Sequence, residues 1–163
     1  MSARQRGFSL IELLIVVAII LVVAAIAIPN LLRSRMAANE ASAVASLRTV
    51  NTSQVIYQSS YGLGFAAALT NLSDGGTPAN CIPPTAPAAA SACLVDNSLA
   101  SGTKSGYTFA YAAVAVGGLN TNYTLNADPV ASGASGQRHF FTDQTNVIRA
   151  NVSAPAAATD PAI

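Results

Sequence analysis

An apolar run near the N-terminus constrains this chain more than any other feature. Residues 8–28 read FSLIELLIVVAIILVVAAIAI, with one charged side chain, Glu12, and neither glycine nor proline. As a helix that rises 1.5 Å per residue, this run is about 31 Å long, which is enough to cross the hydrocarbon core of a membrane. We therefore expect a membrane-length helix over these residues.

This run has three possible interpretations. It could be a secretory signal peptide that is cleaved at a small-residue site after Ala27, or it could be a plain membrane anchor. Neither explains Glu12, because an acidic side chain in an apolar helix costs about 2 to 3 kcal/mol near the membrane centre. The third interpretation is cleavage after Gly7, which creates a positively charged amine on Phe8, four residues before Glu12.

The residues around this junction carry a family resemblance. From Arg6 the chain reads RGFSLIELL, and the apolar run ends in AAIAIPN at Asn30. This combination resembles the prepilin signature of type IV pilins and type II secretion pseudopilins. The resemblance covers roughly residues 1–60 and joins a cleavage junction, an acidic residue at a fixed offset and a helix of membrane length.

The resemblance implies a route of processing and assembly. A prepilin peptidase in the inner membrane would remove residues 1–7 as a leader, and Phe8 would be N-methylated. The mature chain would then polymerise into a helical filament with the help of a pilus or secretion assembly machinery. In that filament, Glu12 would pair with the N-terminus of a neighbouring subunit.

The sequence departs from the family pattern at one position. Many members carry a glycine eight residues before the proline that ends the apolar run, but Leu21 stands there in this chain. Any loosening of the backbone would then depend on Pro29, because a proline inside a helix removes one hydrogen bond and clashes with the preceding turn. We expect a bend near Ile28.

The segment after this proline predicts a second helical half. Residues 30–61 contain no glycine or proline, and Gly62 and Gly64 then provide a stop. Apolar side chains recur at helical spacing, at Ala43, Leu47, Val50, Tyr57 and Tyr61. We expect an amphipathic helix whose apolar face packs on a globular head.

Two cysteines bracket a segment rich in proline and alanine. Cys81 and Cys93 could be two buried free thiols or a disulfide. A disulfide is the better explanation for two cysteines that flank a loop with little regular structure, and it requires an oxidising compartment such as the periplasm. We therefore expect the head on the periplasmic side of the membrane.

The C-terminal half predicts short strands. Tyr107–Val116 alternates aromatic and small residues before Gly117 and Gly118. Further candidates are Tyr123–Ala127, Arg138–Thr142 and Val147–Ala150. These segments predict an α+β fold in which the long helix packs on an antiparallel sheet of about four strands.

Composition excludes several functional classes. With 8 basic and 7 acidic residues, a net charge of +1 and 9% charged residues, the chain does not resemble a highly basic nucleic-acid binder. One histidine, His139, and two cysteines cannot build a four-ligand zinc site. Asp128, Asp143 and Asp160 could offer oxygen ligands to calcium, but they form no short run of alternating carboxylates. No phosphate loop or nucleophile elbow is present, so we expect neither an enzyme nor a cofactor.

We interpret the chain as the structural subunit of a type IV pilus-like filament. It would be an inner-membrane precursor and, after assembly, a filament at the cell surface. The alternatives are a type II secretion pseudopilin and a soluble domain secreted after cleavage at Ala27. The expected segments are a leader (1–7), a membrane and filament-core helix (8–28), an amphipathic helix (29–61), a globular head (62–152) and a flexible tail (153–163).

Overall fold

The computed structural model describes residues 8–82 and 86–163. The chain divides into two compact units, residues 1–35 and residues 36–163. One helix, α1 (Leu10–Tyr61), contributes to both units, so the two predicted helical halves form a single helix of 52 residues. Pro29 lies inside α1 and does not end it. The bend near Ile28 stays a prediction.

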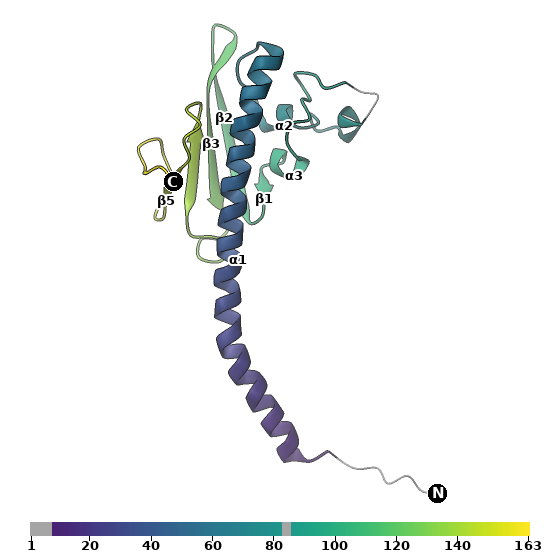
Figure 1. Cartoon of the computed structure of the whole chain (residues 1–163), viewed down its shortest axis with the longest axis vertical. Helices are drawn as coiled ribbons and strands as arrows, with labels where there is room; N and C mark the ends of the chain where they lie inside the picture. Colours follow the sequence, from purple (N-terminus) through teal and green to yellow (C-terminus); the bar gives the residue numbers. More distant parts are fainter. Residues whose placement is uncertain (1–7, 83–85) are drawn as a thin grey trace, which may run out of the picture. The chain divides into compact units, whose positions relative to one another are not determined.

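The second unit contains an antiparallel meander. Five strands pair in the order β1-β2-β3-β4-β5, so each strand lies beside its neighbour in the sequence (Figure 1). The strands are β1 (Thr103–Lys104), β2 (Tyr107–Val116), β3 (Leu119–Pro129), β4 (His139–Asp143) and β5 (Arg149–Asn151). Before them come α2 (Leu69–Leu72), the 3-10 helix η1 (Pro78–Cys81) and α3 (Asn97–Ala100).

The predicted α+β fold is confirmed, with one strand more than expected. The candidate at 107–116 coincides with β2, and the candidate at 138–142 falls on β4 with a shift of one residue. The candidate at 123–127 lies within β3, which begins four residues earlier and ends two residues later. The fourth candidate overlaps β5. The sequence missed β1 because two residues are too few to show an alternating pattern.

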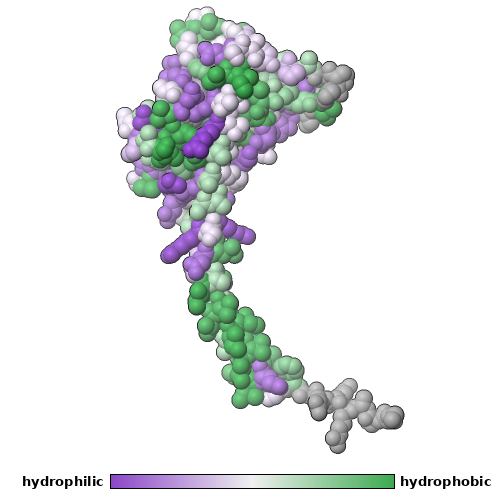
Figure 2. Space-filling view, viewed as in Figure 1, coloured by the Kyte–Doolittle hydropathy of each residue, from purple (hydrophilic) through white to green (hydrophobic). Residues whose placement is uncertain are grey.

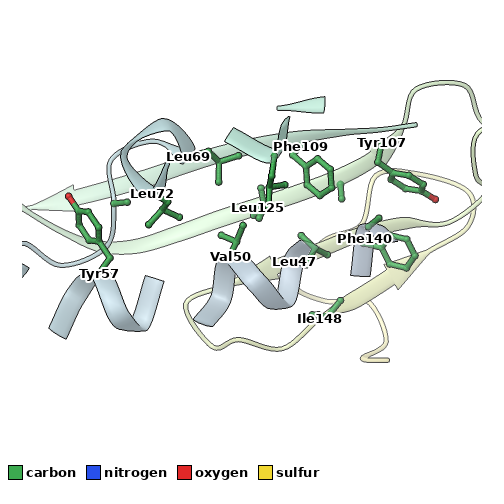
Figure 3. Packing of buried hydrophobic residues seen from close by; sticks show 14 of the residues in the cluster. Leu47, Val50, Tyr57, Leu69, Leu72, Tyr107, Phe109, Leu125, Phe140 and Ile148 are labelled. Atoms are coloured by element: carbon green, nitrogen blue, oxygen red, sulfur yellow. The ribbon is translucent and has the colours of Figure 1, made fainter. Parts of the chain in front are cut away.

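The core lies between the second half of α1 and one face of the sheet. The helix contributes Leu47 and Val50, which face Phe109 and Leu125 of the sheet, and Tyr57, which lies near Leu72 in the same cluster (Figure 3). The apolar positions that the sequence marked on this helix are all buried or packed against the core. Truncation of a buried leucine of this kind costs about 2 to 5 kcal/mol, so this contact holds the head on the helix.

A buried amide on α1 fixes the helix against the sheet. Gln54 is fully buried, and its Nε2 donates to the hydroxyl of Tyr111 on β2 at 2.8 Å. The backbone N–H of Ala66 donates to Gln54 Oε1 at 2.9 Å, and the Tyr111 hydroxyl donates to the Ala66 carbonyl. One side chain thus joins α1, β2 and the loop that follows α1.

Replacement of this amide should destabilise the head strongly. We expect Gln54→Leu to lower the free energy of unfolding by about 2 to 4 kcal/mol, because the buried Ala66 N–H loses its acceptor and the Tyr111 hydroxyl loses a donor. Denaturant unfolding of the detergent-solubilised protein measures this change. Gln58→Leu, an exposed site on the same helix, is the matched control. Equal costs for the two variants would contradict the role of the Gln54 contacts.

The last residues of the chain follow the outer edge of β5. Residues 153–163, which we expected to be flexible, contain no helix or strand beyond an isolated bridge between Ala162 and Arg149. However, the Ala150 N–H donates to the Pro161 carbonyl at 3.1 Å, and the Ile163 N–H donates to the Ile148 carbonyl at 3.0 Å. These bonds cover an edge that would otherwise expose unpaired backbone groups.

Candidate processing and assembly segment

The start of α1 carries the residues that the sequence marked for processing. Gly7 lies outside the described residues. Phe8 is 80% exposed, and α1 begins two residues later, at Leu10. The junction expected to be cut therefore borders the first turn of the helix.

Glu12 has a partner within its own chain. The backbone N–H of Ser9 donates to Glu12 Oε2 at 2.9 Å, and the Leu13 N–H donates to the Ser9 carbonyl at 3.3 Å. Ser9 and Glu12 have the spacing of a capping box, in which a glutamate reaches back to an unsatisfied N–H at the helix start. The positive end of the helix dipole also favours a carboxylate here, by about 0.3 to 1 kcal/mol. Sequence reasoning missed this contact, although the Ser-x-x-Glu pattern was visible.

The first part of α1 exposes apolar side chains all along its length. Every large apolar side chain from Phe8 to Leu32 is between 47% and 80% exposed. Figure 2 shows this as a continuous hydrophobic surface along the helix. By length and composition, α1 is the one helix in the described part of the chain that could cross a membrane. A helix that is apolar all round needs lipid or other protein to cover it.

Two features mark the end of the apolar segment. Pro29 has no N–H to donate, so one intrahelical hydrogen bond is missing there while the helix continues. One turn further on, exposed Arg33 and Arg35 bring the first cations after the apolar run. The change from apolar to charged surface thus falls within two turns of the proline.

The expected disulfide is confirmed. Cys81 and Cys93 are bonded, and their Cα atoms lie 5.7 Å apart. On the Cys93 side, the Cys93 N–H donates to the Ser73 carbonyl at 2.9 Å and the Ala92 N–H donates to the Asn71 carbonyl at 2.8 Å. The disulfide therefore ties Cys81, at the end of η1, to a segment whose backbone is hydrogen-bonded to the end of α2.

Loss of this disulfide should loosen the head locally. For the combined Cys81→Ser and Cys93→Ser variant, we expect a lower melting temperature and more proteolysis within residues 74–103, with α1 intact. In the chain-entropy model, closure of a loop of this size contributes about 3 kcal/mol. Thermal melts and limited proteolysis measure both effects, and reduced wild-type protein is the control. Two free thiols in non-reduced protein, detected by mass spectrometry, would refute the prediction.

An ion pair clamps α1 to the start of β4. Arg138 Nε lies 2.7 Å from Glu40 Oε2, and the Gln137 N–H donates to Glu40 Oε1 at 2.9 Å. The Glu40 side chain is 12% exposed. Burial raises the pKa of this carboxyl, but the hydrogen bonds from Gln137 and Arg138 lower it more, so the pKa lies below its usual value of 4.5.

This clamp predicts a pH dependence of stability. Because the folded pKa of Glu40 is lowered, its contribution is complete above about pH 4.5 and is lost as the pH falls through the folded pKa. The difference in unfolding free energy between wild type and Glu40→Gln should therefore shrink in acid. Ser42→Ala, which removes a hydrogen bond to Ser105, is the control and should give a constant difference. A constant difference for Glu40→Gln as well would count against the clamp.

One titratable pair was not expected from the sequence. His139 Nδ1 on β4 lies 2.6 Å from Asp128 Oδ1 on β3. The β3–β4 register brings these residues together although they are 11 positions apart. Within residues 8–82 and 86–163, no group of three or more His, Cys, Asp or Glu side chains is placed to hold a metal ion. The pair joins two strands and stands apart from any wider cluster of this kind.

Comparisons with known proteins find similarity over part of this chain. Residues 2–28 match the family described as the prokaryotic N-terminal methylation motif. Over 80 residues, the chain is 46% identical to the type IV wide pilus major component PilA4 of Thermus thermophilus, covering 47% of this chain and 60% of that protein. Over 53 residues, it is 47% identical to the type IV major pilin protein PilA of Myxococcus xanthus, covering 32% of this chain and 24% of that protein. No solved structure matches the chain.

Proposed function

We propose that this chain, which belongs to the type IV pilin family by its N-terminal methylation segment, is a major structural subunit of a type IV pilus filament. The similarity to two major pilins supports this proposal. The observation that carries it is the match over residues 2–28, which includes the part of α1 whose apolar side chains are exposed in the described structure.

The exposed apolar part of α1 suits two successive environments, the membrane and the filament core. Before assembly, lipid of the bacterial inner membrane covers residues 8–28, and the disulfide-bonded head stands in the periplasm. After assembly, the same side chains pack against helices of other subunits. Each environment removes about the same apolar surface from water, so transfer from membrane to filament leaves this part of the helix covered throughout.

The junction between Gly7 and Phe8, together with the start of α1, supports a route of processing and assembly. A prepilin peptidase cuts after Gly7, Phe8 becomes N-methylated, and the new N-terminus meets Glu12 of a neighbouring subunit. Pro29 marks the end of the segment that lies in the filament core. The pilus assembly machinery extracts the subunit from the membrane. The net charge of the mature chain is then −1, because removal of Arg4 and Arg6 leaves 6 basic and 7 acidic residues.

Two alternative functions predict a different mature protein or a different assembly. A type II secretion pseudopilin would share the processing but would form no long surface fibre, and the similarity to major pilins favours the pilin. A secreted soluble domain would begin at Ile28 and would lack most of the apolar run. The methylation match, which extends across the whole run, disfavours this second alternative.

Two measurements on the native protein separate these functions. The N-terminal sequence of the mature chain should begin with N-methylated Phe8, and a start at Ile28 would instead support the secreted domain. Antibodies to the head should label long fibres on the cell surface. Processing at Phe8 without labelled fibres would replace the pilin by the pseudopilin.

A further inference from the structure

The outer edge of β2 is largely uncovered by the rest of the subunit. β1 pairs only with the first two residues of β2, through Thr103–Thr108 and Lys104–Tyr107. The last bond on this side runs from the Phe109 N–H to the Gly102 carbonyl at 2.7 Å. No other strand lies beside β2 on this side among the described residues.

The direction of the Phe109 bond identifies which backbone groups are unpaired. In an antiparallel strand, the N–H and C=O of one residue point to the same side, and those of the next residue point to the other side. Since Phe109 points away from β3, the backbone groups of Tyr111 and Ala113 also point away from β3. Within residues 8–82 and 86–163, these outward groups have no backbone partner.

The sequence of this edge lacks the charged and proline residues that commonly protect an edge strand, and the one irregularity in its pairing with β3 falls beyond Ala113, between Val114 and Ala115. Natural edge strands are commonly short, or they carry lysine, proline or inward-pointing charges. β2 has ten residues, YTFAYAAVAV, and the chain contains no charged residue from Ser105 to Ala127. The side chains of Ala110, Ala112 and Val114 are exposed. An apolar edge of this length is a template for another strand.

We propose that the outer edge of β2, at Tyr111 and Ala113, is a strand-addition site for a second copy of this chain. Unpaired N–H and C=O groups at alternate residues are suited to bind an extended backbone. Because the edge carries no charge, it has no group that would favour a charged peptide. This inference rests on the proposed polymer, in which every edge meets other copies at high local concentration.

The symmetry of a polar filament restricts this contact further. All subunits point the same way, so two β2 strands cannot pair with each other about a twofold axis. The added strand is instead a different segment of the neighbouring copy, and such a head-to-tail contact continues without closing. The contact would extend the sheet from one subunit to the next.

Amide hydrogen exchange tests the site without any substitution. Intact filaments and detergent-dissociated subunits are exchanged in heavy water and read residue by residue by NMR after quenching. The N–H groups of Tyr111 and Ala113 should exchange at least about tenfold more slowly in filaments than in free subunits. The N–H of Ala112, which faces β3, is the internal control and should be protected in both states. Equal exchange of Tyr111 and Ala113 in the two states would overturn the site, while filament formation itself would keep the proposed function intact.

A pair of substitutions provides the second test. Ala112→Lys places a charge on the edge strand, whereas Asn122→Lys places one at an exposed position of β3 that pairs with Val114, on the side of β2 away from the proposed site. We expect Ala112→Lys to lower the filament yield about tenfold, the effect of about 1.4 kcal/mol, and Asn122→Lys to leave it near wild type. Equal yields for the two variants would refute strand addition. Fast exchange of the Tyr111 and Ala113 N–H groups in filaments of the purified protein would also refute it, and would point to a peptide of another protein as the occupant.

Discussion

Precursors that carry Gly7→Val should remain uncleaved in the membrane and form no filaments. Gly7 has no side chain, so a peptidase can approach the bond to Phe8 closely from either side. A branched valine adds bulk at the scissile bond and should exclude the chain from the active site. Immunoblots report the size of the chain, and electron microscopy reports the fibres. We expect an essentially complete loss of both mature protein and pili.

A second leader variant separates the junction from the leader as a whole. Gln5→Val adds the same side chain two residues before the junction and should be processed normally. Mature fibres from Gly7→Val would contradict cleavage at this bond. Release of a soluble head from Gly7→Val would support the alternative cut after Ala27, because that cut does not involve residue 7.

Local patterns in the sequence predicted the main elements of this fold. An apolar run followed by apolar residues at helical spacing predicted the long helix. The alternation of aromatic and small residues between two glycine-bearing turns predicted β2. The disulfide could be read because two cysteines flank one loop. In each case the information lies within a short window of the chain.

Contacts between distant residues escaped the same reasoning. Asp128 pairs with His139 only because β3 and β4 align in one register, and Glu40 meets Arg138 only because α1 lies near the start of β4. Backbone hydrogen bonds join Pro161 to Ala150 and Ile163 to Ile148, and the alanine- and proline-rich composition of the tail does not predict them. Such contacts depend on the packed fold, which spacing along one chain does not encode.

Glu12→Gln should block assembly while leaving earlier steps intact. The Ser9 N–H donates to Glu12 Oε2, and a glutamine carbonyl can accept the same bond, so the helix start is preserved. The substitution removes only the charge. A neighbouring subunit can slide until its Phe8 amine meets this carboxylate. Opposite charges about 4 Å apart gain about 4 kcal/mol at an effective dielectric of 20, before desolvation is subtracted.

We therefore expect normal cleavage and membrane insertion of Glu12→Gln, with filament yield reduced at least about tenfold, since 1.4 kcal/mol suffices for that factor. Immunoblots of membrane fractions and counts of sheared fibres measure the two stages. Glu12→Ala, which loses both the charge and the bond to Ser9, distinguishes the pairing from the helix cap. If Glu12→Gln polymerises at the wild-type rate and with the same subunit stagger while Glu12→Ala does not, the carboxylate serves as a cap for its own helix. The pairing between subunits would then have to be abandoned, because the charge that it requires would be absent from a normal filament.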